Sequence, residues 1–163
     1  MRVIHALEPL QKSVMLIGPT PRKPKPGVAP TPSWRPHAIE LFREAGYDGL
    51  LLIPEAADWL SHDNYDAQIK WELEAINQAT TIMCWVPRDL ETMPAFTTNV
   101  EFGMIVATGK MLFGYPTDAP KMAYLHSVAD KFHVPVYRNL EWLVRDTVKA
   151  VNDRHLATLR RAA

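Results

Sequence analysis

TIMCWV at residues 81–86 is an apolar run that stops at Pro87, and TTNVEFG follows at residues 97–103 after a polar loop. An apolar run bounded by proline predicts a short buried strand. The stretch after the loop predicts the start of a helix, with Glu101 one turn inside it. Because open α/β folds bind ligands beyond the carboxyl ends of their strands, Glu101 is a candidate nucleophile.

Short apolar runs and helical patterns alternate along the whole chain. Further buried strands are predicted at residues 13–18, 49–53, 111–114 and 134–136. Helices are predicted over about 34–45 after Ser33, from Asp63 or Asn64 to about 79, and over about 99–108, 118–131 and 140–159. This alternation predicts a flavodoxin-like, doubly wound α/β fold, in which a five-stranded parallel sheet has helices on both faces. We expect residues 1–163 to form a single domain.

The charge balance and the cysteine content bound the function classes. The chain has 18 Lys plus Arg against 18 Asp plus Glu, so its formal net charge is zero. A balanced charge indicates neither a nucleic-acid polymer nor a membrane surface as the partner. Cys84 is the single cysteine, which excludes a disulfide framework, and no apolar run approaches the roughly 20 residues of a membrane span. We therefore expect a cytoplasmic protein.

Familiar cofactor signatures do not occur in the sequence. It contains neither a G-x-x-x-x-G-K-[ST] loop nor a G-x-G-x-x-G fingerprint, and its six histidines show no metal-ligand spacing. We expect no cofactor and no metal. Carboxylates remain as the candidates for chemistry.

Two carboxylates each have a structural explanation as well as a chemical one. Thr98 and Glu101 fit the capping box S/T-x-x-E/Q, in which the glutamate bonds a free amide at the helix start. A helix N-terminus favours negative charge, so either role predicts an ionised Glu101, which covalent glycosyl transfer would also require. Glu72 lies beside Leu73 and three residues from Ile69, and this spacing alone suits a solvated residue bordering an apolar stripe.

Residues 19–36 hold seven of the 14 prolines of the chain, together with Arg22, Lys23 and Lys25. A loop this long in a compact domain is usually functional or disordered, because ordering it costs conformational entropy. The segment is therefore either a solvated polyproline-like connector or a part of the ligand site.

Short motifs follow the predicted strand ends in a fixed order. They are GPTPR at 18–22, SWR at 33–35, PE at 54–55, Tyr65 with Gln68 and WE at 71–72, PR at 87–88, Thr98 with EFG at 101–103, GK at 109–110 and GYP at 114–116. Over about residues 13–125, their order and spacing resemble the nucleoside 2-deoxyribosyltransferase-like proteins.

This resemblance implies a flavodoxin-like fold and attack by a glutamate on the anomeric carbon of a nucleoside, which gives a glycosyl-enzyme intermediate. It puts that glutamate at Glu101 and the second acidic position of the family at Glu72. An aspartate that contacts the base in the characterised transferases is replaced here by Ala95, and Asp89 is a nearby substitute. The related nucleotide N-glycosidases keep the glutamate, pass the sugar to water and bind a 5′-phosphate.

Substrate contacts are expected at the strand ends and helix starts, from Gly18, Pro19, Arg22, Arg35, Tyr65, Arg88, Thr98 and Asn99. The three arginines are candidates for phosphate binding, because guanidinium pairs with phosphate oxygens in bidentate fashion. Tyr65 and Trp85 are candidates to stack on a base, although Trp85 suits the core equally well. Glu72 or Asp89 is expected to give a proton to the departing base.

The expected activity is therefore cleavage of the N-glycosidic bond of a (deoxy)nucleoside or nucleotide, with transfer to another base or to water. A non-catalytic nucleotide-binding or sensing module of the same fold is the alternative, because Ala95 removes a base contact. A third interpretation is a structural interaction domain. Related enzymes commonly assemble as oligomers, and we expect a homo-oligomer. The last helix has an apolar stripe that suits either an oligomer face or core packing, formed by Leu140, Val144, Val148 and Val151.

Overall fold

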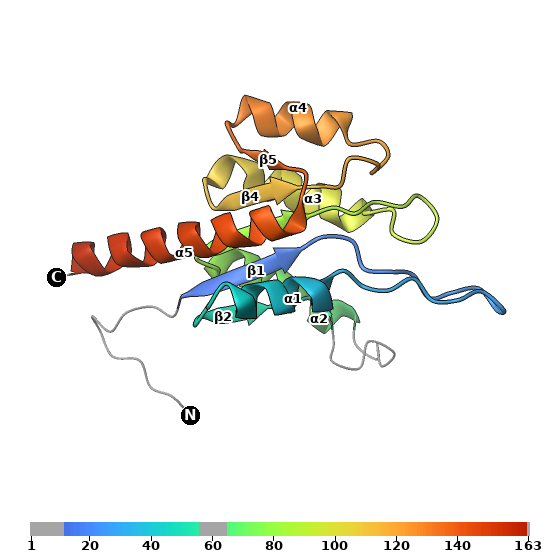
Figure 1. The fold of residues 1–163 in the computed structure, drawn as a ribbon, viewed down its shortest axis with the longest axis horizontal. Helices are drawn as coiled ribbons and strands as arrows, with labels where there is room; N and C mark the ends of the chain where they lie inside the picture. The colour runs from blue at the N-terminus through green and yellow to red at the C-terminus, as the bar shows by residue number, and fades with distance from the viewer. Residues whose placement is uncertain (1–11, 56–64, 163) are drawn as a thin grey trace.

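The computed structural model describes residues 12–55 and 65–162, in which one parallel sheet is flanked by helices (Figure 1). The strands are β1 (Ser13–Ile17), β2 (Leu50–Leu52), β3 (Thr81–Trp85), β4 (Met111–Gly114) and β5 (Val136–Tyr137). The helices are α1 (Arg35–Glu44), α2 (Tyr65–Gln78), α3 (Phe96–Ile105), α4 (Ala123–Lys131) and α5 (Leu140–Ala162), and the 3-10 helix η1 (Val106–Thr108) follows α3.

The strand order in the sheet of the described residues is β2-β1-β3-β4-β5, and every neighbouring pair is parallel. Ile17 pairs with Cys84 and Trp85 pairs with Gly114, so the carboxyl ends of the central strands lie together at one edge. This arrangement confirms the predicted flavodoxin-like fold, and it brings the predicted site segments to the same edge of the sheet.

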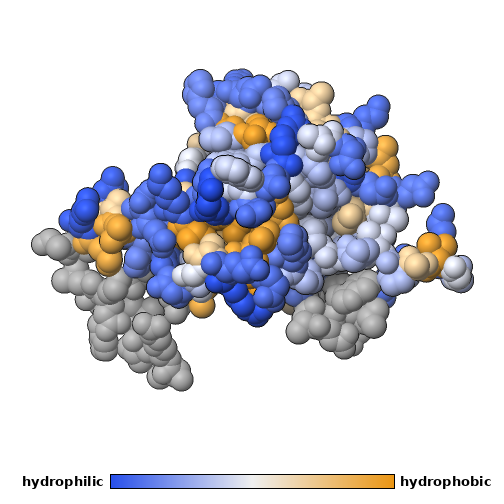
Figure 2. All heavy atoms as spheres, viewed as in Figure 1, coloured by the Kyte–Doolittle hydropathy of each residue, from blue (hydrophilic) through white to orange (hydrophobic). Residues whose placement is uncertain are grey.

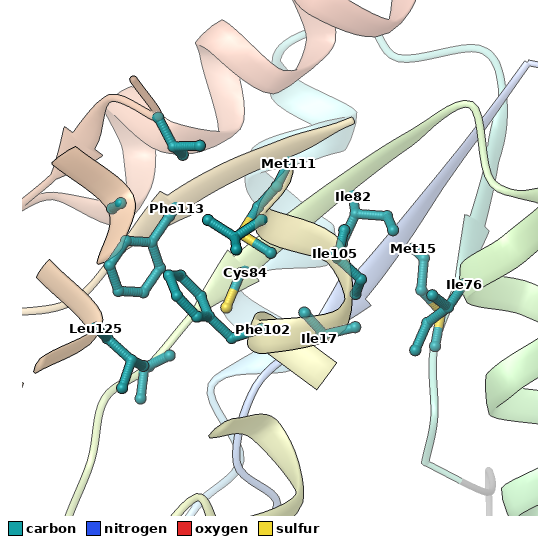
Figure 3. Close-up of a cluster of buried hydrophobic side chains, with 14 of the residues drawn as sticks. Met15, Ile17, Ile76, Ile82, Cys84, Phe102, Ile105, Met111, Phe113 and Leu125 are labelled. Carbon is teal, nitrogen blue, oxygen red and sulfur yellow. The ribbon is translucent and has the colours of Figure 1, made fainter. Parts of the chain in front are cut away.

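Both faces of the sheet are buried, because alternate residues of the central strands point to opposite sides. On β1, Met15 and Ile17 join the core under α2, α3 and α4, which Figure 3 shows around Phe102 and Ile105. The alternate residues Val14 and Leu16 join a second core, which packs against α1 and α5. The continuous apolar runs seen in the sequence are therefore what a sheet covered on two sides requires.

The apolar stripe of α5 belongs to the second core. Val144, Val148 and Val151 are at most 8% exposed, and Leu140 packs against the same cluster. Of the two interpretations of this stripe, core packing is therefore correct. The alternative, an oligomer face on this side of α5, is wrong because these side chains are already covered by the sheet and α1.

Some element boundaries differ from the sequence prediction. The strand predicted as buried at 49–53 is β2, a three-residue edge strand in which Leu50 is 41% exposed. Trp34 holds the N-cap position of α1, although the Ser33 hydroxyl accepts the N–H of Arg35 at 3.2 Å. The helix predicted from 118 begins only at Ala123, since Lys121 has a positive φ of 56° that an α-helix cannot contain. The predicted caps Asp63 and Asn64 lie outside the described residues.

Figure 2 shows that the face formed by α1 and α5 is mostly hydrophilic, with apolar surface in a strip between the two helices. None of the helices within residues 12–55 and 65–162 has the length and hydropathy that crossing a membrane requires.

Gly18, directly after β1, provides a test of this packing. A Cβ at Gly18 would lie 2.2 Å from the backbone oxygen of Trp85 and 2.7 Å from the ring of Trp34. Because a central strand cannot move away, we expect Gly18→Ala to lower the free energy of unfolding by about 3 kcal/mol, the upper range for overpacking.

The matched control is Gly103→Ala on α3, whose Cβ would meet no atom of the described residues within 4 Å. Alanine in a helix interior is more favourable than glycine by about 0.5–1 kcal/mol, so this variant should unfold at equal or higher urea concentration than the wild type. Equal urea midpoints for the two variants would contradict the packing described at Gly18.

Candidate active site

A cavity of about 430 Å³ lies at the carboxyl ends of β1 and β2, beside the first turns of α2 and α3. Its lining includes all the predicted site residues except Arg88, Asp89, Asn99 and Trp85. The lining residues are Gly18, Pro19, Thr20, Arg22, Arg35, Pro54, Glu55, Tyr65, Gln68, Glu72, Pro94, Ala95, Phe96, Thr97, Thr98 and Glu101.

Helix α3 begins at Phe96, three residues earlier than the sequence pattern predicts. Ala95 is its N-cap residue with a left-handed φ of 62° and no side-chain capping bond, and the Ala95 carbonyl accepts the N–H of Asn99 at 3.1 Å. Thr98 and Glu101 are therefore the third and sixth helical residues. A capping box needs Thr98 at the N-cap position, which Ala95 holds instead. The capping-box interpretation is therefore wrong.

Glu101 points into the cavity from a nearly buried position, at 8% exposure. Burial raises the pKa of Glu101 from 4.5 to about 7; the nearby Glu72 charge adds to this rise and Arg35 opposes it. The predicted effect of the helix N-terminus, a fully ionised carboxylate, is outweighed by desolvation. With a pKa of about 7, Glu101 is present in both its protonated and its ionised form at neutral pH.

Glu72 on α2 faces the same cavity, where it is half-buried. Gln68, four residues earlier on the helix, donates its side-chain N–H to the Glu72 carboxylate at 2.7 Å. The same Gln68 amide donates to the carbonyl of Pro54 at 3.1 Å, which ties α2 to the turn after β2. The Glu72 charge is one of the causes that raise the pKa of Glu101, so the two side chains interact within the cavity.

Arg35 forms the rigid wall of the cavity opposite these carboxylates. Its side chain is 1% exposed, pairs with the Glu55 carboxylate at 2.6 Å and donates to the Gly18 carbonyl at 2.7 Å and the Thr20 hydroxyl at 3.1 Å. The Ser33 hydroxyl donates to both oxygens of Glu55, at 3.2 and 3.1 Å. Arg35 thus uses most of its guanidinium N–H groups within the protein. Few of them are left for the phosphate that the sequence analysis assigned to Arg35.

Arg22 has a freer guanidinium at the exposed side of the cavity. Its side chain makes a long 3.4 Å bond to the Glu91 carbonyl and lies 5.6 Å from the centre of the Phe96 ring. The Arg22 backbone N–H donates to the Thr92 carbonyl at 2.8 Å. The proline-rich loop is therefore attached to the loop before α3, and Arg22 remains accessible to an anion.

Three predicted site residues lie outside the cavity and stabilise its surroundings. The buried Arg88 guanidinium donates to the Lys121 carbonyl at 2.8 Å and to the side-chain oxygen of Asn99. Asp89 accepts the N–H groups of Glu91 and Thr92 at 3.0 and 2.7 Å within its own turn. Hydrogen bonds from Thr92 lower the pKa of Asp89, which is the opposite of what a proton donor needs.

The remaining predicted contacts divide between rim, floor and core. Tyr65 is 61% exposed at the rim of the cavity. Thr98 is 2% exposed and lines the cavity one turn before Glu101. Trp85 belongs to the core under α1 and α5, so of its two interpretations the core role is correct.

Some polar residues of the cavity were not predicted as site residues. Gln68 and Glu55 each hold a charged neighbour in place, and the Thr20 hydroxyl accepts from Arg35. The spacing of Gln68 and Glu72, four residues apart on one helix, was a usable signal for their pairing. The partners of Glu55 are 20 or more residues away in the chain, so no local pattern indicates them.

No group of three or more His, Cys, Asp or Glu side chains able to hold a metal ion occurs in residues 12–55 and 65–162. The cavity instead offers three carboxylates, of which Glu55 is paired with Arg35, one accessible guanidinium, and the hydroxyls of Tyr65 and three threonines.

Comparison with known proteins gives one family match. A family model described as "Nucleoside 2-deoxyribosyltransferase like" matches residues 11–119, which include every residue that lines the cavity. No curated protein matches the chain.

The raised pKa of Glu101 predicts a stability change with a definite sign. Between pH 4.5 and about 7 the folded state holds a proton that the unfolded state has lost, so stability decreases as the pH rises through this window. Glu101→Gln removes the buried charge and should stabilise the protein above pH 7, by about 3 kcal/mol at most for a shift of this size.

The measurement is the melting temperature of wild type and Glu101→Gln from pH 5 to pH 8. The gain of the variant should grow with pH, whereas Glu74→Gln, on the exposed side of α2, should show no such growth. A gain that is independent of pH would show that ionised Glu101 is not destabilising.

Proposed function

Because the chain belongs to the nucleoside 2-deoxyribosyltransferase-like family, we propose that it cleaves the N-glycosidic bond of a nucleoside or nucleotide through a covalent intermediate on Glu101. Membership supports a function related to glycosyl transfer. The observation that carries the specific reaction is the nearly buried Glu101 facing a second carboxylate, Glu72, in a cavity of about 430 Å³.

In the first proposed step, an ionised Glu101 oxygen attacks C1′ while the C1′–N bond breaks. The electron pair of that bond leaves with the base, and Glu72 gives the base a proton. In the second step, water or another base attacks C1′, the ester bond to Glu101 breaks, and Glu72 takes up the proton of the incoming group. Because burial raises the pKa of Glu101, the proton that Glu101 holds in the folded protein has to pass to Glu72 before the attack, which requires an ionised Glu101.

The geometry favours Glu72 over Asp89 as the proton donor. Glu72 shares the cavity with Glu101 and is held by Gln68, so it has a fixed position relative to the nucleophile. Asp89 is exposed, is not part of the lining, and is used by the turn that it begins. An acid must lie within hydrogen-bond reach of the leaving base, or reach it through one water.

Ala95 is the residue that supports the second candidate function, a nucleotide-binding or sensing module. Ala95 lines the cavity without any polar side-chain group, at a position where the characterised transferases have an aspartate that contacts the base. Without this aspartate, the protein would assist the departure of the base from C1′ less strongly. Binding of a nucleotide, seen as a raised melting temperature, without any release of base would favour this module over the enzyme.

The test of the reaction is to incubate the protein with deoxynucleosides and nucleoside monophosphates and to follow free base by chromatography. We expect release by the wild type and a loss of roughly a thousandfold or more in Glu101→Gln, the scale of losing a covalent nucleophile. Glu74→Gln is the matched control and should keep wild-type turnover. Absence of base release from every substrate, or full activity of Glu101→Gln, would overturn the proposed mechanism.

Arg22 is proposed to bind the 5′-phosphate when the substrate is a nucleotide. It lines the cavity beside the N-terminus of α3 and has a weakly bonded guanidinium, unlike Arg35 and Arg88. A charge-assisted bond contributes about 1.5–3 kcal/mol, so Arg22→Met should raise KM for a monophosphate by about tenfold or more and leave KM for the nucleoside unchanged.

Lys25→Met provides the control, because Lys25 lies exposed on the same loop but outside the cavity lining. It should change neither KM. An equal rise in KM for nucleoside and monophosphate in Arg22→Met would assign Arg22 to the loop attachment instead.

A further inference from the structure

A second cavity, of about 290 Å³, lies between the two arms of the proline-rich loop. The outgoing arm follows β1 and the returning arm leads into α1, and Figure 1 shows both arms extending from the same edge of the sheet. The lining consists of Thr20 and Pro21 from the outgoing arm, residues 30–33 from the returning arm, and Glu55 after β2. We call this space the loop cavity, to distinguish it from the cavity that contains Glu101.

A tight turn at the far end of the loop brings the chain back. Pro26 and Gly27 occupy its centre, Gly27 has a positive φ of 79°, and the Val28 N–H donates to the Lys25 carbonyl at 3.0 Å. Proline followed by glycine at these positions is typical of a type II turn. Prolines also restrict the unfolded chain, so this loop loses less entropy when it is ordered, and the loop cavity can keep its shape without a ligand.

The loop cavity offers a hydrogen-bond acceptor that is only partly used. Its three prolines have no backbone N–H, so they contribute apolar rings and carbonyl groups. Glu55 Oε1 accepts from both Arg35 and Ser33, whereas Oε2 accepts only from Ser33 among the described residues. A carboxylate oxygen has two lone-pair positions, so Oε2 can accept one further N–H group from a ligand.

Two threonines of the lining have a hydroxyl hydrogen that is free to donate. The Thr20 hydroxyl accepts from Arg35 at 3.1 Å, and neither Thr20 nor Thr31 donates a side-chain hydrogen bond to another described residue. A hydroxyl has one O–H donor besides its acceptor lone pairs. A ligand with an N–H group close to an unprotonated ring nitrogen would therefore match Glu55 together with one of the threonines.

A nucleobase with an amino group has this pattern. Adenine presents an amino group beside unprotonated ring nitrogens, carboxylates accept the amino groups of bases, and threonine hydroxyls also bond to base edges. Its flat ring can pack on proline rings, as aromatic and proline surfaces do in peptide recognition. A cavity of about 290 Å³ is just below the roughly 300–1,000 Å³ of small-molecule sites, so it suits one base rather than a whole nucleotide.

The loop cavity adjoins the cavity that contains Glu101. Thr20 and Glu55 line both of them, so the same two side chains separate the two spaces. Arg35 lines the first cavity and holds this partition in place through its 2.6 Å ion pair with Glu55. A base in the loop cavity would therefore lie next to the place where the proposed reaction releases a base.

We propose that the loop cavity binds a free nucleobase that carries an amino group, as adenine does. The reason for a base at this place rests on the proposed function, in which one base leaves C1′ and another one or water takes its place. Binding itself is measured without a nucleoside and without the chemistry of Glu101.

Equilibrium dialysis with radiolabelled adenine tests the site. Thr31→Trp fills the loop cavity with a large side chain, and Thr31 does not line the cavity that contains Glu101. We expect this variant to bind one equivalent of adenine fewer than the wild type. Val28→Trp is the matched control and should lose none, because Val28 is 57% exposed on the same loop and lines neither cavity.

Circular dichroism melts confirm that both variants fold. Thr31→Val, which removes only the hydroxyl, should weaken adenine binding by roughly threefold, the scale of one neutral hydrogen bond. A wild type that binds no adenine, or equal binding by the wild type and Thr31→Trp, would overturn the proposal.

Purine provides the matched ligand, because it keeps the ring nitrogens of adenine and lacks the amino group. A hydrogen bond to a charged group is worth more than a neutral one, so purine should bind to the loop cavity at least about tenfold more weakly than adenine. Equal affinities would overturn the assignment of Glu55 as the acceptor of the amino group.

These results separate the loop cavity from the reaction proposed for Glu101. Adenine binding that Thr31→Trp removes, without base release from any substrate, would support the loop cavity and contradict the reaction. Base release by a protein in which Thr31→Trp leaves adenine binding unchanged would do the reverse.

Discussion

The buried ion pair between Arg35 and Glu55 is the interaction on which the site depends. Arg35 begins α1, Glu55 follows β2, and the same guanidinium donates to the Gly18 carbonyl after β1. A positive charge at a helix N-terminus is unfavourable by itself, and burial lowers the pKa of Arg35, so the position is tenable only because the carboxylate and carbonyls compensate the charge. Removing one partner of such a pair typically costs about 3–5 kcal/mol. The cavity wall is thus fixed before any substrate binds, as an electrostatic site requires.

Unlike Arg35, Glu101 carries a charge that its surroundings compensate poorly. Glu101 has no hydrogen-bond donor assigned to it among the described residues, and Glu72 adds negative charge to its surroundings, so its pKa rises although Arg35 acts in the other direction. This poorly compensated charge suits the proposed role of Glu101, because the anomeric carbon gains positive charge in an oxocarbenium-like transition state. The fold tolerates this cost because the cores on both faces of the sheet stabilise the strands that hold α3.

The sequence predicted the sheet well, because proline-bounded apolar runs and their alternation with helices depend on local chain properties. It could not show that β2 is an edge strand, since a run of three leucines is compatible with both an edge strand and a central strand. The start of α3 was misplaced because Thr98 and Glu101 fit a capping box by coincidence, and the left-handed backbone of Ala95 leaves no compositional signal. Glu101 was proposed from its position after a buried strand and a polar loop, whereas Glu72 was proposed as a site residue only through the family resemblance. Arg88 was assigned to the ligand because its real partner, the Lys121 carbonyl, is distant in sequence.

Helix α3 connects the core with the cavity. Its inner side contributes Phe102 and Ile105 to the core, and Thr98 and Glu101 line the cavity. A helix of 10 residues cannot shift one of these surfaces without shifting the other, because close-packed contacts leave little freedom. The core contacts of Phe102, the residue after Glu101, therefore also fix the position of the carboxylate that the proposed reaction uses.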